Sequence, residues 1–185
     1  DVASEKEKAA LYDNPQNSIH LSIPCGQCPS ERASKTLRQW KDNGCLQRDT
    51  DAAIYLYYQY FRLPGDPSPY CRKGFICKIR LYDWEQNVIL RHENTMPGSV
   101  DEQVELLAAT RLNASPTHGL YSDETFELEK FMDDSMQCPI CETEDYQGIR
   151  NVMGAIRDPK TIKRFVDIMK DKQVILADGH HRYTG

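Results

Sequence analysis

The sequence predicts an α+β protein in which helices flank a mixed sheet. Two segments rich in Tyr, Phe and Ile, at 53–62 and 74–84, have the composition of strands. Helical signals alternate with the strand-like segments. The last helical signal, Asp158-Pro159, begins a helix that is followed by an apolar run near the end of the chain. A helix that returns to a strand commonly places two strands side by side and in parallel, so we expect a mixed sheet.

The first half of the chain carries three boundary signals. Ser4 and Glu7 match a capping box, the reciprocal hydrogen-bond pattern that begins a helix. Asn43-Gly44 is a typical helix end, and the turn-forming segment 63–67 joins two strand-like runs. The elements expected here, in order, are a helix at 4–13, a strand at 18–23, a helix at 30–41 and strands at 53–62 and 74–84.

In the second half, apolar spacing and one proline identify the helices. Asp158-Pro159 is a strong helix start, because proline at the first helical position loses no hydrogen bond. The first two elements expected here are a helix at 100–112 with Val104, Leu107 and Ala108 on one face, and a helix capped by Ser122-Asp123 that carries Phe126, Leu128 and Phe131. A strand at 149–156 follows. The last two are a helix after Asp158 that buries Ile162, Phe165, Val166 and Met169, and a buried strand at 174–177.

Composition limits the class of protein. The 185 residues suffice for one domain or two small ones, and the 39% hydrophobic and 28% charged residues are ordinary for a soluble globular chain. The net charge of −5 argues against nucleic-acid binding by charge alone. No apolar run reaches the length of a membrane span and no signal peptide begins the chain, so we expect a cytoplasmic protein without a membrane partner. We also expect 1–185 to be a fragment of one larger α+β domain, lacking a short head and a C-terminal part.

The last thirteen residues are the most informative segment. An apolar run at 174–177 is followed by an acid, a glycine and three basic side chains, namely Asp178, Gly179, His180, His181 and Arg182. This order predicts a strand, a tight turn and a helix start, whose free N–H groups and positive dipole end favour phosphate. Asp178 is then a candidate metal ligand or proton acceptor. The structural alternative is a polar cluster that caps a helix and pairs internally.

Several segments, in the same order along the chain, resemble an uncharacterised prokaryotic family known as domain of unknown function number one thousand and fifteen. The string ADGHHRY at 177–183 resembles the signature of this family, and 91–98 resembles its histidine–glutamate–threonine loop. The resemblance covers nearly the whole chain. One departure is the acidic segment 99–103, where the family usually carries basic residues.

The loop at 91–98 contains two further candidates. Position 96 is methionine, so His92-Glu93 does not begin a zinc-protease motif. Glu93 is a candidate general base or magnesium ligand, and His92 a candidate phosphate or substrate contact. The alternative is an exposed loop with a salt bridge between Glu93 and Arg91. The family resemblance favours the functional interpretation.

The corner from Gly179 to Arg182 is also similar to the phosphate-binding turn of the ParB and sulfiredoxin superfamily, which includes free-serine kinases. This similarity implies that Gly179, His180, His181 and Arg182 hold the phosphates of ATP, ADP or pyrophosphate with Mg²⁺. Asp178 or Glu93 would accept the hydroxyl proton or hold the magnesium. The leading hypothesis is therefore a small-molecule kinase, with a phosphate donor and a small-molecule substrate, foremost free serine, as its partners. A nucleotide-binding switch without catalysis, a zinc-stabilised interaction domain and a hydrolase stay as alternatives, and homo-oligomerisation is left open.

Seven cysteines are many for a cytosolic domain, and four of them form two C-x-x-C pairs. Cys25 with Cys28 and Cys138 with Cys141 together supply the four thiolates of a tetrahedral zinc site. The long separation between the pairs requires the fold to bring them together. Each pair alone could instead be a redox pair or two surface cysteines.

Overall fold

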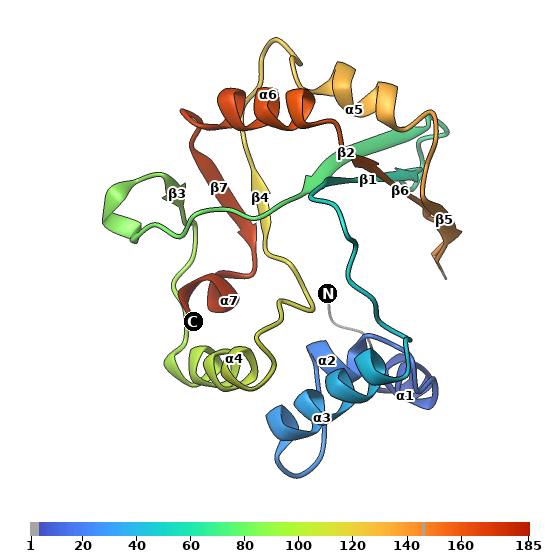
Figure 1. Cartoon of the computed structure of the whole chain (residues 1–185), viewed down its shortest axis with the longest axis vertical. Coiled ribbons are helices and arrows are strands. Elements are labelled where there is room, and N and C mark those ends of the chain that lie inside the picture. The colour runs from blue at the N-terminus through green and yellow to red at the C-terminus, as the bar shows by residue number, and fades with distance from the viewer. Residues whose placement is uncertain (1–3, 146) are drawn as a thin grey trace. The chain divides into compact units, whose positions relative to one another are not determined.

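The computed structural model describes residues 4–145 and 147–185 (Figure 1). The chain is α+β and divides into two compact units. The first unit comprises the described part of Asp1–Arg48 together with Arg91–Leu120 and Ile175–Gly185, and the second comprises Asp49–Leu90 and Tyr121–Val174. Among the described residues, no helix combines the length and apolar character needed to cross a bilayer.

The elements follow in chain order. They are α1 (Glu5–Asp13), α2 (Ile19–Ser22), α3 (Pro29–Asp42), β1 (Ile54–Phe61), β2 (Tyr70–Ile76), the 3₁₀ turn η1 (Trp84–Gln86), β3 (Ile89–Leu90), α4 (Pro97–Thr110), β4 (His118–Leu120), α5 (Glu129–Ser135), β5 (Cys141–Glu144), β6 (Arg150–Ile156), α6 (Pro159–Met169), β7 (Val174–Asp178) and α7 (His180–Thr184).

The helices of the first unit begin largely where the sequence predicts. Ser4 and Glu7 form the expected capping box at the start of α1. The segment 18–23, however, is not a strand, because Asn17 Oδ1 accepts the Ile19 N–H at 3.0 Å and the chain continues as the short helix α2. Its buried Leu21 packs in a cluster with two buried residues of α3, Leu37 and Trp40. The hydrogen bond from the Ile19 N–H to the Asn17 side chain and the burial of Leu21 against α3 therefore override the strand prediction.

Helix α4 and strand β7 lie where expected but are less buried than their sequences suggest. Val104 and Ala108 of α4 are exposed, whereas Leu107 is half-buried. In β7 only Leu176 is buried, and Ile175 is 47% exposed. Strand β4 spans three residues and pairs with β7 as a short antiparallel ladder.

The second unit is built on a four-stranded antiparallel sheet of order β2-β1-β6-β5. Alternate residues of the central strands, such as Leu56 and Val152, point to a core that Met132 of α5 and Phe165 of α6 complete. Figure 1 shows α5 and α6 over the same face of this sheet. Tyr58 is 2% exposed, and its hydroxyl donates to Asp133 Oδ1 at 2.8 Å. Burial, together with this hydrogen bond, raises the pKa of Tyr58 well above its ordinary value.

A mixed sheet occurs as predicted, but the strands on either side of α6 do not pair with each other in parallel. Strand β6 pairs with β1 on one side and β5 on the other, so neither edge is open to the strand that follows α6. Strand β7 pairs with β4 instead, antiparallel. The expectation that a helix returns the chain to a parallel neighbouring strand fails here, because β5 pairs with the second edge of β6 in a hairpin.

Three further boundaries in the second unit differ from the prediction. The strand expected at 74–84 is β2 at Tyr70–Ile76, since its register with β1 begins directly after the 63–69 turn. The helix expected after Ser122-Asp123 begins only at Glu129, because the chain first makes a turn in which Phe126 is left-handed and 64% exposed. Helix α6 is capped by Asp158 as predicted, but Val166 is 59% exposed and lies off its buried face.

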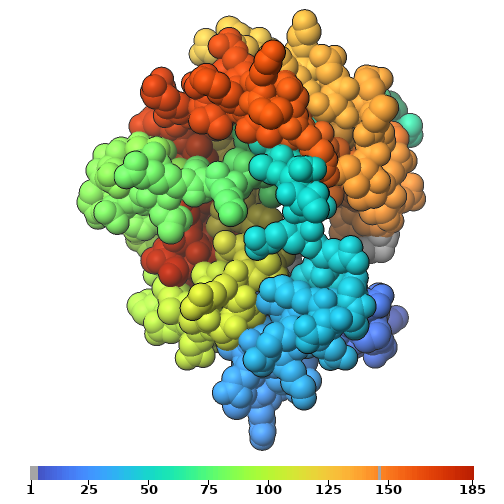
Figure 2. All heavy atoms as spheres, viewed as in Figure 1, coloured from blue at the N-terminus to red at the C-terminus, as the bar shows by residue number. Residues whose placement is uncertain are grey.

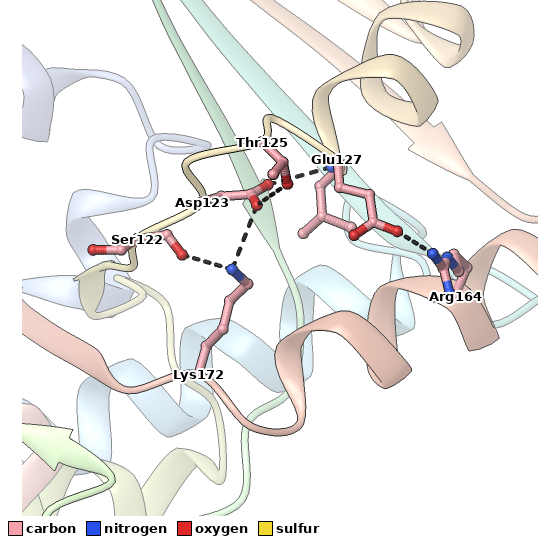
Figure 3. A network of polar contacts seen from close by, with 7 residues as sticks. Ser122, Asp123, Thr125, Glu127, Arg164 and Lys172 are labelled. Carbon is pink, nitrogen blue, oxygen red and sulfur yellow. Dashed lines mark hydrogen bonds and ion pairs between the residues drawn. The ribbon is translucent and has the colours of Figure 1, made fainter.

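A polar network holds this delayed turn in place (Figure 3). Lys172 Nζ donates to the Ser122 carbonyl oxygen at 2.6 Å and to Asp123 Oδ1 at 3.4 Å. The other carboxylate oxygen of Asp123 accepts the Leu128 N–H at 3.4 Å, and Arg164 of α6 pairs with Glu127. Asp123 therefore stabilises the turn that precedes α5 and does not cap the helix itself.

Candidate functional site

The terminal turn forms as the sequence predicts. Strand β7 ends at Asp178, Gly179 is left-handed with φ +89°, and the helical turn α7 begins at His180. A Cβ atom at position 179 would lie 2.8 Å from Arg182 Nη2 and 2.9 Å from Thr117 Cγ2. Both the backbone angle and the space therefore require glycine. Figure 2 shows the dark red C-terminal residues at the surface beside α4, with which α7 is in contact.

Arg182 folds back over this glycine. Its Nη2 donates to Asp178 Oδ2 at 2.6 Å and to the Pro116 carbonyl oxygen at 3.4 Å. Burial raises the pKa of Asp178, but the hydrogen bond and the charge of Arg182 outweigh this effect, and the net pKa is lowered. The Asp178 carboxylate is therefore ionised at neutral pH while its side chain stays 66% exposed. Arg182 Nε is buried and has no hydrogen-bond partner among the described residues.

The loop at 91–97 lies against this turn through the ring of His92. His92 Nδ1 is 2.9 Å from the Leu176 carbonyl oxygen. A carbonyl can only accept, so Nδ1 carries the hydrogen and, in the neutral ring, Nε2 carries the lone pair. Since His92 is exposed, this lone pair belongs to a side chain at the protein surface.

His180 lies beneath His92 and beside Glu93. It is 1% exposed, and its ring meets that of His92 edge-to-face, with centroids 4.6 Å apart and planes at 85°. His180 Nδ1 is 2.9 Å from Glu93 Oε1, but the two groups are not aligned for a hydrogen bond. His180 Nε2 is buried and has no hydrogen-bond partner in the described part of the chain. Glu93 itself is 52% exposed.

His181 anchors the other end of the loop. Its Nε2 accepts the Met96 N–H at 3.1 Å, immediately before α4 begins at Pro97. The Nε2 lone pair is thus used in the structure, and in the neutral ring the hydrogen is on Nδ1. Two of the three successive basic side chains are therefore turned toward the loop, and the third, Arg182, is turned toward Asp178.

The seven candidate residues from the two sequence motifs all lie in the first unit and are connected by these contacts. They are His92, Glu93, Asp178, Gly179, His180, His181 and Arg182. Sequence reasoning missed the neighbours that act through backbone groups or a methyl, namely the carbonyls of Pro116 and Leu176 and the side chain of Thr117. Nothing in their residue types signals such roles, because any residue supplies a carbonyl.

The four cysteines of the C-x-x-C pairs do not form a site within either unit. Cys25 and Cys28 belong to the first unit, Cys138 and Cys141 to the second, and all four are exposed. Across residues 4–145 and 147–185, no group of three or more His, Cys, Asp or Glu side chains is arranged to hold a metal ion. The shared zinc site stays a prediction.

Comparison with known proteins identifies one related group. A family model described as "Protein of unknown function (DUF1015)" matches residues 1–185. No curated protein and no solved structure matches the chain.

Proposed function

The chain belongs to the DUF1015 family, whose function is unknown, and on the chain's own geometry we propose that it is a small-molecule kinase. In this proposal it transfers a phosphoryl group from a nucleotide or pyrophosphate to a hydroxyl group, foremost that of free serine. The observation that carries the proposal is the packing of loop 91–97 on the β7–α7 turn. This packing brings the loop that carries His92 and Glu93 into contact with the turn that carries Asp178 and Arg182.

Each group has a role in the transfer. Arg182, whose side chain is 25% exposed, neutralises phosphate charge through its guanidinium group. Gly179 supplies the left-handed backbone on which the turn depends, and Arg182 and Thr117 pack against it. The phosphate-binding role of this turn rests on the resemblance of its sequence to the ParB and sulfiredoxin superfamily. It agrees with the general demand of phosphoryl transfer for positioning and charge neutralisation.

The proton of the acceptor hydroxyl goes to His92 Nε2 or to the carboxylate of Glu93. As the hydroxyl oxygen bonds to the terminal phosphorus of the donor, the bond from that phosphorus to the bridging oxygen breaks. The remainder of the donor leaves with the bonding electrons. A neutral histidine whose Nδ1–H is held by a carbonyl is suited to this role, because its tautomer is already the one that accepts at Nε2.

The residues of the site fit Mg²⁺ as a cofactor. Magnesium is commonly bound by one or two carboxylates together with substrate phosphates, and not by a complete protein cage. The exposed carboxylates of Asp178 and Glu93 would hold it, and when bound it would neutralise charge on the donor phosphates.

Thermal unfolding with ATP, ADP or pyrophosphate plus Mg²⁺ tests the phosphate site. A ligand at 100 times its Kd stabilises the folded state by about 2.7 kcal/mol. For a chain of this size that corresponds to a rise in Tm of roughly 5 to 10 °C. The rise should disappear in Arg182→Ala. It should persist in the matched control Arg164→Ala, which removes an ion pair of α6 in the second unit. No rise with any donor in the parent protein would refute the proposal.

Turnover separates the kinase from its alternatives. Glu93→Gln and Asp178→Asn should lower phosphorylation of serine, measured by transfer of labelled phosphate, far more than they lower the thermal shift. Binding without transfer in the parent protein would favour a nucleotide-dependent switch. Unfolding on chelation, with one zinc per chain by metal analysis and no phosphate effect, would favour the zinc-stabilised interaction domain.

A further inference from the structure

We propose that His180 is a positioning residue that holds His92 and Glu93 in working orientation, and that it does not itself contact phosphate. The catalytic consequence rests on the proposed kinase function, whereas the positioning can be tested without it. At 1% exposure, His180 has almost no surface through which a ligand could touch it. Its ring and its Nδ1 instead contact the two candidate proton acceptors of loop 91–97.

The burial of this imidazole needs an explanation. Placing a polar ring nitrogen in the interior without a hydrogen bond is unfavourable, and both ring nitrogens of His180 lack a bond of normal geometry among the described residues. A phenylalanine of similar shape would avoid that cost. The imidazole is accounted for if its Nδ1 is needed 2.9 Å from the Glu93 carboxylate.

His92 needs a second contact for a different reason. Its hydrogen bond to the Leu176 carbonyl fixes the tautomer but leaves the ring able to turn about that bond. The edge-to-face contact with His180, at 4.6 Å and 85°, restricts this rotation. Nε2 of His92 is thereby aimed in one direction, and a misplacement of a reacting group by 1 Å can slow a reaction by about 100-fold.

Nitrogen-15 spectra of the imidazole side chains test the positioning directly. In the parent protein His92 should show one sharp set of signals for the Nδ1–H tautomer, and in His180→Ala these signals should broaden by exchange because the ring becomes free to turn about its hydrogen bond to Leu176. His20 is the matched control, because its Nε2 lies 3.0 Å from the Asn14 carbonyl oxygen and its ring contacts Tyr12 edge-to-face at 5.6 Å. The His20 signals should not change.

Two further variants separate the ring from its nitrogens and keep the test valid if His180→Ala does not fold. His180→Phe keeps the ring contact, so the His92 signals should stay sharp. His180→Asn keeps a polar group but loses the ring, so the His92 signals should change. In kinase assays His180→Ala should lower kcat by roughly 10- to 100-fold with little change in the KM for the donor. The kcat of His180→Phe should lie between that of the parent protein and that of His180→Ala.

The outcomes distinguish the two proposals. Unchanged His92 signals in folded His180→Ala or His180→Asn would overturn the positioning role, whatever the activity. A raised KM for the donor with unchanged kcat would also overturn it, because it would make His180 a phosphate contact. Altered His92 signals in a protein without any kinase activity would support the positioning role and reject the proposed function.

Discussion

Replacing Gly179 by alanine tests the turn at the centre of the site. The substitution has two costs, which can be estimated separately. A left-handed backbone costs a non-glycine residue about 1 to 2 kcal/mol, and Gly179 has φ +89°. The new Cβ would also lie 2.8 Å from Arg182 Nη2 and 2.9 Å from Thr117 Cγ2. Overpacking of this kind costs about 1 to 3 kcal/mol more.

Gly44→Ala supplies the matched control in the same unit. Gly44 has φ +76°, so it carries the same backbone cost, but its nearest neighbour would be Gln47 Nε2 at 3.5 Å, an ordinary contact. The difference between the two variants therefore isolates the steric effect at the site. It should be about 1 to 3 kcal/mol by urea unfolding. In a chain of this size that is roughly 2 to 12 °C in Tm.

A double variant identifies the clashing group. The arginine end is flexible and can move away, whereas the Thr117 methyl is one atom from its backbone. Thr117→Ser removes that methyl, so it should recover part of the loss in Gly179→Ala and change little alone. If Gly179→Ala and Gly44→Ala differ by less than about 0.5 kcal/mol, the close packing around the turn is not as described and the reasoning fails.

Three other perturbations give separate expectations. Lys172→Met removes the hydrogen bonds that Lys172 donates to the 121–128 turn, where the accepting carboxylate side chain is only 11% exposed. The change should lower the free energy of unfolding by about 1 to 3 kcal/mol. Asp178→Asn should reduce the loss of folding stability that the parent protein shows as the pH is lowered. Because the pKa of Asp178 is lower in the folded than in the unfolded protein, its ionised carboxylate stabilises the folded state above the unfolded pKa of 3.8. This stabilisation is lost as the pH falls through the folded pKa. Tyr121→Phe should reduce the loss of folding stability that the parent protein shows at alkaline pH. Burial raises the pKa of Tyr121 to about 12, so its contribution is present below the ordinary value of 10.0 and is lost as the pH rises toward 12.

The controls for these variants come from the same chain. Lys163→Met breaks an exposed i,i+4 pair on α6 and should change stability by no more than about 0.5 kcal/mol. An equal effect of Lys172→Met would show that the network of Figure 3 adds no more than a surface pair. For the two pH predictions, chemical unfolding across pH 2–5 and pH 9–12 is the measurement. Curves of parent and variant that remain parallel would contradict them.

Local chemistry predicted much of the fold. The capping box of Ser4 and Glu7, the Asp158-Pro159 helix start and the left-handed Gly179 all appear as expected, because each depends on residues within one turn of the chain. The prediction failed where a distant partner decided the outcome. Leu21 is helical because it packs on α3, and β7 pairs with β4 because β5 had already taken the second edge of β6.

The same division holds for the site. The sequence alone identified both motifs, the loop with His92 and Glu93 and the turn from Asp178 to Arg182, since their residue types carry the chemistry. The tertiary structure decided what each side chain does: His180 is buried beneath His92, His181 holds the loop backbone and Arg182 pairs with Asp178. Three adjacent basic residues look equivalent in a sequence. They differ in the folded protein because a helical turn points successive side chains in directions about 100° apart, toward different neighbours.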